Sequence, residues 1–315
     1  MIAPTGGAAA CRVRRTFGIA AALLLGGVAV PSLGAQAPLT RVIMLGTGTP
    51  NADPDRSGPA VSIVRNGRSY LVDAGPGVVR RAAAAFRAGT AALEAKELKV
   101  LFLTHLHSDH TIGLPDVILG AWTLERTVPL EVYGPPGTRA MITHLLAAYE
   151  ADIRNRIDGA EPANETGWQV NVHEIAPGKV FDDGNVRVTA FAVPHGDWEV
   201  AFGYRFDSAD RSIVISGDTR ASDAAVLACN GCDLLLHEVY SAERFRTRPP
   251  EWQRYHARAH TSTEELAVLA ARARPRQLVL YHQLYWGTDD AGLIAELRRA
   301  GYGGPVVSAR DLGIY

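Results

Sequence analysis

Short apolar runs alternate with helical patterns along most of this chain. Runs at residues 41–45, 61–64 and 69–72 are typical of buried strands, and Asn66-Gly67 is a strong hairpin signal between the last two. Further strands are predicted at 98–104, 130–133, 170–175, 186–193, 201–206, 212–216, 234–237 and 277–281, and helices at 78–88, 138–151, 221–228, 263–273 and 291–300. Because helices lie between strands without strict βαβ repetition, the pattern predicts an α/β fold of two mixed β-sheets flanked by helices.

The composition is that of a folded enzyme-sized chain. It has 315 residues, of which 47% are hydrophobic, and this excludes a disordered chain and a small disulfide-dense scaffold. No linker, repeat or change of composition divides residues 38–315. We therefore expect one domain over 38–315, preceded by a signal peptide at 1–37.

The first residues have the pattern of a secretory signal. Arg12, Arg14 and Arg15 precede an apolar run at 17–30, which leads into small residues with an expected cleavage after Ala35. The run is too short to span a bilayer comfortably. We expect a periplasmic or secreted protein with no membrane anchor after processing. The Sec and twin-arginine routes both stay open, as does an uncleaved amphipathic leader.

The expected cleavage and export change how the charge and the cysteines of the chain are interpreted. The full chain has 32 basic and 33 acidic residues, and three of the basic ones lie in 1–37, which leaves 29 against 33 and a net charge of −4. This argues against a dedicated polyanion binder. In an oxidising compartment, Cys229 and Cys232 are expected to form a local disulfide at a helix end, with two free thiols as the alternative.

A histidine cluster directly follows one predicted strand. Residues 103–115 include His105, His107, Asp109 and His110. Alternation places the first two histidines on one side of an extended segment. Neutral imidazoles and a carboxylate are the ligands that zinc and similar divalent metals accept. The cluster therefore predicts a metal site.

Three isolated polar residues come after other apolar strands. His195 follows 191–194, Asp218 follows 213–217 and His282 follows 278–281. Each has an ordinary explanation when taken alone, such as a capping residue or a buried hydrogen-bonded histidine. Their shared position after strands, together with the cluster, predicts one site at the edge of the sheets.

These motifs resemble those of the metallo-β-lactamase-fold hydrolases, closest to the ribonuclease Z and arylsulfatase-like branch. The resemblance covers nearly all of residues 38–315 and implies an αββα sandwich. It also implies two divalent ions, zinc first, with manganese or iron as alternatives. One ion would be held by His105, His107 and His195, the other by Asp109, His110 and His282, and Asp218 would bridge them.

The resemblance implies hydrolysis by a metal-bridging hydroxide. His260 would then be the general acid, oriented by Glu238, and Asp109 would act beside them. The ordinary alternatives are a helix-start role for His260 and a buried ion-pair role for Glu238.

Substrate class is predicted from one missing segment. The bacterial ribonuclease Z pattern has a long tRNA-gripping arm, whereas only 206–215 separates the two blocks here. We therefore expect an exported phosphodiesterase or arylsulfatase-like enzyme with a small-molecule ester substrate, and nucleic acid is disfavoured. The alternatives are a ribonuclease Z-like tRNA 3′ endoribonuclease, a β-lactam or lactone hydrolase, and a non-catalytic metal-binding protein. A homodimer is left open.

One segment beside the predicted site has no clear pattern. Residues 243–258 contain Trp252 and several arginines, and we interpret them as a surface loop, with a flap over the metals as the alternative. Trp122, Trp198 and Trp286 are compatible with an aryl pocket, although aromatic residues more often belong to a core.

Overall fold

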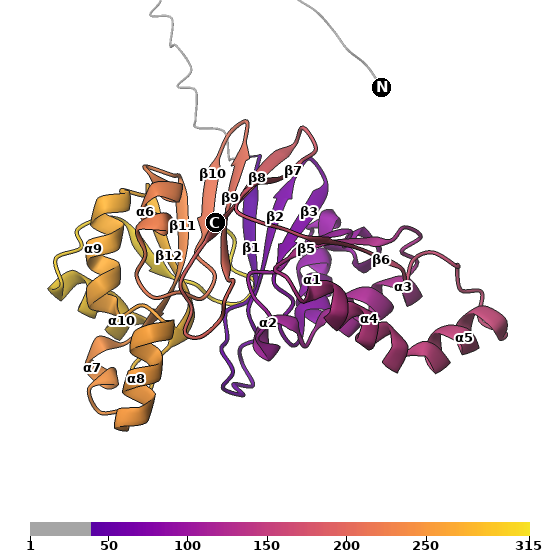
Figure 1. The fold of residues 1–315 in the computed structure, drawn as a ribbon. Helices are drawn as coiled ribbons and strands as arrows, with labels where there is room; N and C mark the ends of the chain where they lie inside the picture. Colours follow the sequence, from indigo (N-terminus) through magenta and orange to yellow (C-terminus); the bar gives the residue numbers. More distant parts are fainter. Residues whose placement is uncertain (1–38) are drawn as a thin grey trace, which may run out of the picture. The chain divides into compact units, whose positions relative to one another are not determined.

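Two mixed β-sheets lie face to face between helices in the computed structural model, which describes residues 39–315 (Figure 1). The predicted signal peptide lies outside the described residues. The first sheet has the order β1 to β6: Arg41–Gly46, Ala60–Arg65, Arg68–Val72, Val100–Phe102, Leu130–Gly134 and Val170–Glu174. The second runs from β13 back to β7: Val306–Ser308, Gln277–Leu284, Leu234–Tyr240, Ser212–Ile215, Phe202–Ser208, Val186–Ala192 and Gly178–Asp182.

The helices cover the outer faces of the two sheets. Those that follow strands of the first sheet are α1 Val78–Arg87, α2 Ser108–Thr111, α3 Ala121–Thr123, α4 Thr138–Ala148 and α5 Glu150–Asp158, with short turns η1 Ala91–Leu93, η2 Ala95–Glu97 and η3 Asp116–Gly120. Those of the second half are α6 Asp223–Cys229, α7 Ala242–Phe245, α8 Pro250–Ala259, α9 Thr263–Ala273 and α10 Asp290–Arg299. Within residues 39–315, none of them is long and apolar enough to cross a bilayer.

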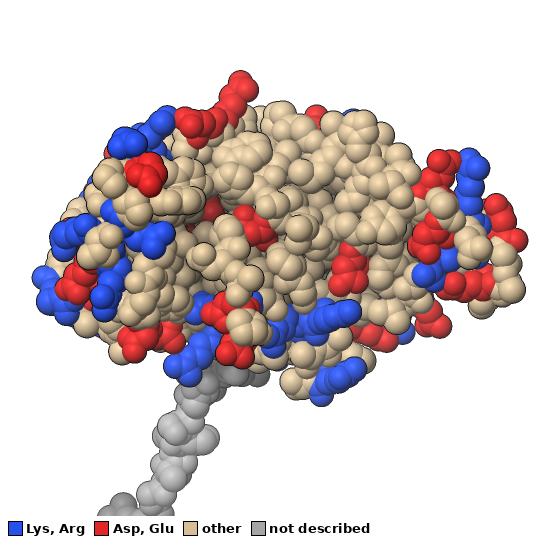
Figure 2. Space-filling view, turned by 90° about the horizontal axis from the view of Figure 1, so that it is seen from below, with Lys and Arg blue, Asp and Glu red and all other residues tan. Residues whose placement is uncertain are grey.

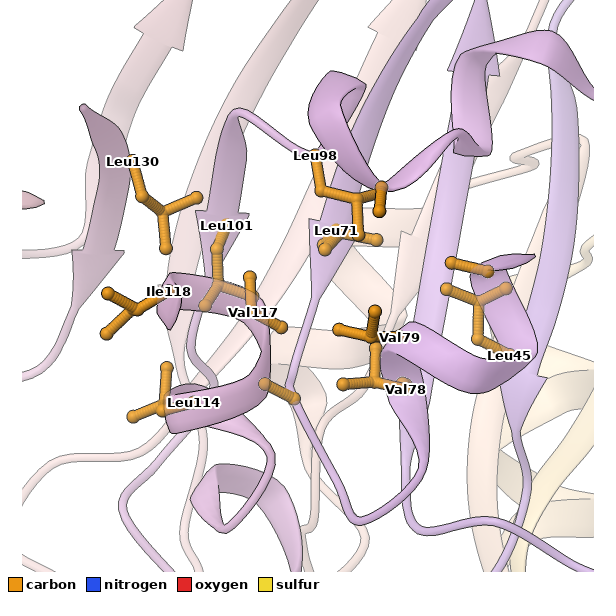
Figure 3. Close-up of a cluster of buried hydrophobic side chains, with 14 of the residues drawn as sticks. Leu45, Leu71, Val78, Val79, Leu98, Leu101, Leu114, Val117, Ile118 and Leu130 are labelled. Atoms are coloured by element: carbon orange, nitrogen blue, oxygen red, sulfur yellow. The ribbon is translucent and has the colours of Figure 1, made fainter. Parts of the chain in front are cut away.

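Alternation along the strands produces three apolar layers. In β1, Val42 and Met44 point between the sheets, whereas Ile43 and Leu45 point outward into the cluster that includes α1. Figure 3 shows this outer cluster, where Leu71 of the sheet lies near Val79 of α1, and Leu101 near Val117 and Ile118. A third layer joins β10–β12 to α6, α9 and α10. The layers confirm the predicted αββα arrangement.

Strand direction determines where the site lies. Strands β10, β11 and β12 are parallel, and β8 has the same direction because both β8 and β10 are antiparallel to β9. Strands β3 and β4 of the first sheet are also parallel to each other. Since the carboxyl ends of parallel strands meet at one edge, the residues that follow them are brought together.

Two predicted segments differ from the structure. The single helix expected at 138–151 is two helices, α4 and α5, which meet at Tyr149. The loop expected at 243–258 is mostly helical, with α7 and α8. Proline is tolerated in the first turn of a helix, so Pro250 begins α8 instead of preventing it. Because α8 buries only His256 and Ala259, its apolar pattern is weak.

The structure joins Cys229 and Cys232 by a disulfide, as the sequence predicts. Their Cα atoms are 4.7 Å apart. Cys229 is the last residue of α6, and Asn230 and Gly231 reverse the chain in the left-handed conformation. The bridge therefore closes the turn between α6 and β11.

Candidate metal centre

Seven side chains converge at the edge where the two sheets meet. They come from the β4–α2 loop, helix α2, the loop after β8, the loop after β10 and strand β12: His105, His107, Asp109, His110, His195, Asp218 and His282. All seven are residues that the sequence singled out as metal ligands.

Local backbone conformation directs the side chains of Asp218 and His282 toward the site. Gly217 has φ of 62°, and a Cβ there would lie 2.5 Å from the carbonyl oxygen of Phe202, so only glycine fits before Asp218. His282 has φ of 48° and lies at a register shift between β11 and β12. This bulge continues β12 beyond the predicted end at Tyr281 and turns the His282 side chain toward the site.

Three imidazoles form the first group of ligand atoms. Nδ1 of His107 lies 3.0 Å from Nε2 of His105 and 3.1 Å from Nε2 of His195. His105 and His195 are buried, and His107 is partly buried. Burial lowers the pKa of His107 to about 4 and that of His105 well below its ordinary value. The three rings therefore carry free lone pairs at neutral pH.

The second group combines carboxylates with imidazoles. Nε2 of His282 lies 3.3 Å from Oδ2 of Asp109 and 3.3 Å from Oδ2 of Asp218. Nε2 of His110 lies 3.4 Å from Oδ1 of Asp218. On its other side, Asp218 Oδ2 is 4.0 Å from Nε2 of His195. Asp218 thus lies between the two groups.

Unpartnered polar atoms show that this cluster fits divalent cations. Nε2 of His110 and Oδ1 of Asp218 are buried and lack a hydrogen-bond partner among the described residues. Burial opposes the charge on Asp218, but the facing rings of His282 and His110 hold its pKa well below its ordinary value. A carboxylate among imidazole nitrogens is a ligand set for a divalent metal ion, which replaces the ring protons when it binds.

Asp73 is a site residue that the sequence analysis missed. It follows β3 and is buried, and Oδ2 accepts a hydrogen bond from Nδ1 of His110 at 2.8 Å. Oδ1 accepts from the backbone N–H and the hydroxyl of Thr104, at 2.8 and 3.0 Å. Asp73 therefore orients His110 and the loop that carries the cluster. Its position directly after an apolar strand is the signal that could have identified it.

Neighbouring groups orient two more imidazoles. Nδ1 of His195 donates to the carbonyl oxygen of Ala259 at 2.8 Å. The indole nitrogen of Trp198 lies 2.7 Å from Nε2 of His107. Trp198 thus contacts a metal-site residue, whereas Trp122 is buried in the core.

Glu238 and His260 lie beside the metal cluster as an unusual buried pair. Nδ1 of His260 is 3.3 Å from Oε1 of Glu238, and that oxygen accepts hydrogen bonds from the backbone N–H groups of Thr219 and Thr261. Burial raises the pKa of Glu238 well above its ordinary value and lowers that of His260 to about 4. Glu238 therefore holds two loops together as well as facing the His260 ring.

A cavity of about 650 Å³ opens over the cluster. Its wall includes Asp109, Asp218, His260 and His282, together with side chains of α8 and of the segment that precedes it. The interpretation of 243–258 as a plain surface loop is therefore wrong, because Trp252 and its neighbours face the site. Trp286 lines the same cavity.

Comparison with known proteins identifies the family. Residues 68–283 match the model described as the Beta-lactamase superfamily domain. Ribonuclease Z of Mycobacterium sp. (strain KMS) is 36% identical over 248 residues, which cover 78% of this chain and 85% of that protein. Ribonuclease Z of Mycobacterium bovis (strain BCG / Pasteur 1173P2) is 34% identical over 248 residues, 78% of this chain and 86% of that protein.

Solved structures share the fold. The metallo-beta-lactamase fold protein YhfI from Bacillus subtilis superposes with a TM-score of 0.65 at 16% identity, over 88% of this chain and 99% of that one. Human tRNase Z, short form, has a TM-score of 0.64 at 24% identity, over 87% and 98%.

These relatives correct the predicted activity. The expectation of a phosphodiesterase or arylsulfatase-like enzyme for small esters is wrong, and the ribonuclease Z-like alternative is the one supported. The short β9–β10 connection shows which insertion the chain lacks, but its length does not determine which ester the metal centre accepts. The chain is a metal-dependent hydrolase of the metallo-β-lactamase fold. It therefore belongs to the beta-lactamase superfamily and is a homologue of ribonuclease Z.

Proposed function

We propose that this protein is a ribonuclease Z-like endoribonuclease that hydrolyses a phosphodiester bond in RNA. The observation that carries the proposal is the complete set of seven His and Asp side chains in a chain 36% identical to ribonuclease Z. Precursor tRNA is the first substrate to test, because human tRNase Z is one of the structural neighbours.

We propose that two divalent ions, zinc first, occupy the site. His105, His107 and His195 would hold one ion, Asp109, His110 and His282 would hold the other, and Asp218 would contact both. When bound, such ions supply an activated water at neutral pH and polarise the phosphoryl oxygens. The chain's own side chains then orient the phosphodiester and move protons.

His260 is the proposed proton donor to the leaving oxygen. It lines the cavity, and because Nδ1 faces Glu238, Nε2 is the ring nitrogen left for the substrate. Glu238 faces this ring and orients it, and the backbone N–H groups of Thr219 and Thr261 hold the Glu238 side chain in place. Asp109 also lines the cavity, where its carboxylate lies 3.3 Å from Nε2 of His282.

Export is a separate proposal. Its support is the arginine-rich start and the apolar run at 17–30, followed by small residues before Ala35. It makes no difference to the chemistry of the site.

The deciding assay is cleavage of a precursor tRNA with a 3′ trailer by the metal-loaded protein. We expect a discrete cut that a chelator abolishes and added metal restores. His105→Ala should abolish the cut, and Arg154→Gln, on the distant surface of α5, serves as the matched control. A fully metal-loaded protein that leaves the precursor intact would refute the proposal.

A further inference from the structure

We propose that α8 and the segment that precedes it form a binding platform for single-stranded RNA beside the metal centre. The platform consists of Arg248, Trp252 and Tyr255, with Trp286 behind them. This inference rests on the proposed ribonuclease function and names the part of the chain that grips the substrate.

The first observation is a pair of exposed aromatic side chains on α8. Trp252 is 47% and Tyr255 40% exposed, yet both line the cavity. The Trp252 ring stacks on the buried His256 ring with centroids 5.7 Å apart, and Tyr255 meets the same ring edge-on at 5.0 Å. Supported in this way, the two rings are ordered and still have free faces. Unstacked bases of single-stranded RNA bind to such faces.

The second observation is the distance from the platform to the ligands. Tyr255 also meets the His260 ring edge-on, with centroids 6.0 Å apart. The same cavity is lined by Asp109, Asp218 and His282. A base stacked on α8 therefore places its own phosphate, or the next one, at the metal centre.

The third observation is charge. Residues 242–259 contain two glutamates and five arginines, namely Arg244, Arg246, Arg248, Arg254 and Arg258. Figure 2 views the molecule from below, where the left end, which carries α7 to α10, shows many basic side chains with acidic ones among them. Arg246 pairs with Glu264 and Arg258 with Asp197. The other three make no ion pair with residues 39–315.

Arg248 is the arginine best placed for a phosphate. Its guanidinium lies over the Trp286 ring, 5.3 Å from the centroid, and it lines the cavity. Its buried Nε has no hydrogen-bond partner within the described part of the chain. Glu251, on the same rim, is the acidic side chain that offsets part of this charge. An unpaired guanidinium stacked on an indole suits a phosphate or a base plane.

The short β9–β10 connection adds a reason for such a platform. Strand β9 ends at Ser208 and β10 begins at Ser212, so no RNA-binding arm is inserted there. In a domain with an acidic net charge, the basic and aromatic side chains of the platform complement RNA in their chemistry.

The experiment measures binding and cleavage separately. A labelled single-stranded RNA of about eight nucleotides with phosphorothioate linkages, which resist hydrolysis, is titrated with the metal-loaded protein in an anisotropy assay. We expect Trp252→Ala and Tyr255→Ala to raise Kd by about 5- to 150-fold each, the usual range for one stacked base. Trp252→Phe should recover most of the affinity. Arg248→Gln should weaken binding and reduce the slope of log Kd against log salt by about 0.7.

Matched controls and a second substrate make the outcomes decisive. Tyr149→Ala removes an aromatic ring of 41% exposure at the far end of α4 and should bind like the wild type. For Trp252→Ala, the loss in kcat/KM should be larger for RNA than for a small aryl phosphodiester that has no base. Variants that match Tyr149→Ala in RNA affinity and salt slope would overturn the platform. A wild type that binds the RNA through these residues but cuts no RNA would overturn only the proposed function.

Discussion

Asp73→Asn tests whether the residue behind the metal centre controls it. The substitution keeps the shape of the side chain, and asparagine tolerates the left-handed backbone at this position, where φ is 63°. It replaces one carboxylate oxygen with an NH₂ group. In the wild type, the two oxygens accept hydrogen bonds from His110 and Thr104, so every contact of Asp73 needs an acceptor.

The amide can satisfy only one of these two partners. If its NH₂ faces His110, Nδ1 must become the acceptor and the proton moves to Nε2, which then loses the lone pair that faces Asp218. If its oxygen faces His110, the NH₂ meets the backbone N–H of Thr104. Loss of such an outer partner typically costs 10–100-fold in metal affinity, which is about 1.4–2.7 kcal/mol.

Competition with a chromogenic chelator measures this effect directly. We expect the Kd for zinc to rise by roughly 10- to 100-fold, and most at the ion held by His110. Asp210→Asn is the matched control, because Asp210 also accepts hydrogen bonds from a threonine but lies away from the cluster. If folded Asp73→Asn protein binds zinc with wild-type affinity, Asp73 does not orient His110.

Four more outcomes follow from the structure. His260→Ala should keep its metals yet lose about 100-fold in rate for model phosphodiesters with poor leaving groups and little for a nitrophenyl phosphodiester, and an equal loss for every phosphodiester would exclude proton donation. Asp218→Ala should lose both ions or fall well below one equivalent by elemental analysis, whereas retention of two ions would show that Asp218 is not shared. Arg126 is fully buried and donates only to backbone carbonyl oxygens. Arg126→Met should therefore lower the free energy of unfolding in urea by about 3–5 kcal/mol, and a decrease below about 1 kcal/mol would contradict this role. Burial opposes ionisation of Asp210, but hydrogen bonds from Thr40 and Ser208 and the charge of a neighbouring arginine outweigh burial and lower the pKa of Asp210 to about 2. The wild type should therefore lose its stability advantage over Asp210→Asn as the pH falls from about 4 to 2. An advantage that persists at pH 2 would be inconsistent with that pKa.

Export gives one further measurement. Intact-mass analysis of the exported protein should show the loss of residues 1–35, and a mass that includes them would contradict cleavage after Ala35.

The sequence alone determined the layered fold and the seven candidate ligand residues. Apolar runs of strand length recur with helical segments between them, and burial on the sheet faces requires that pattern. His105, His107, Asp109 and His110 are close in space because they are close in the chain. His195, Asp218 and His282 could be placed because each follows a strand, and strands that share a direction end at one edge.

The tertiary structure alone decided the surroundings of those ligands. Asp73 acts through a hydrogen bond to His110, 37 positions away, and no local pattern encodes that contact. Helix α8 was not predicted because it buries so little, since its exposed side chains face a cavity instead of a core. The substrate class was misjudged from the short β9–β10 hairpin because one local segment does not describe the surface that binds the substrate. Local sequence determines which elements form, whereas a binding surface depends on which distant side chains the packing of those elements brings together.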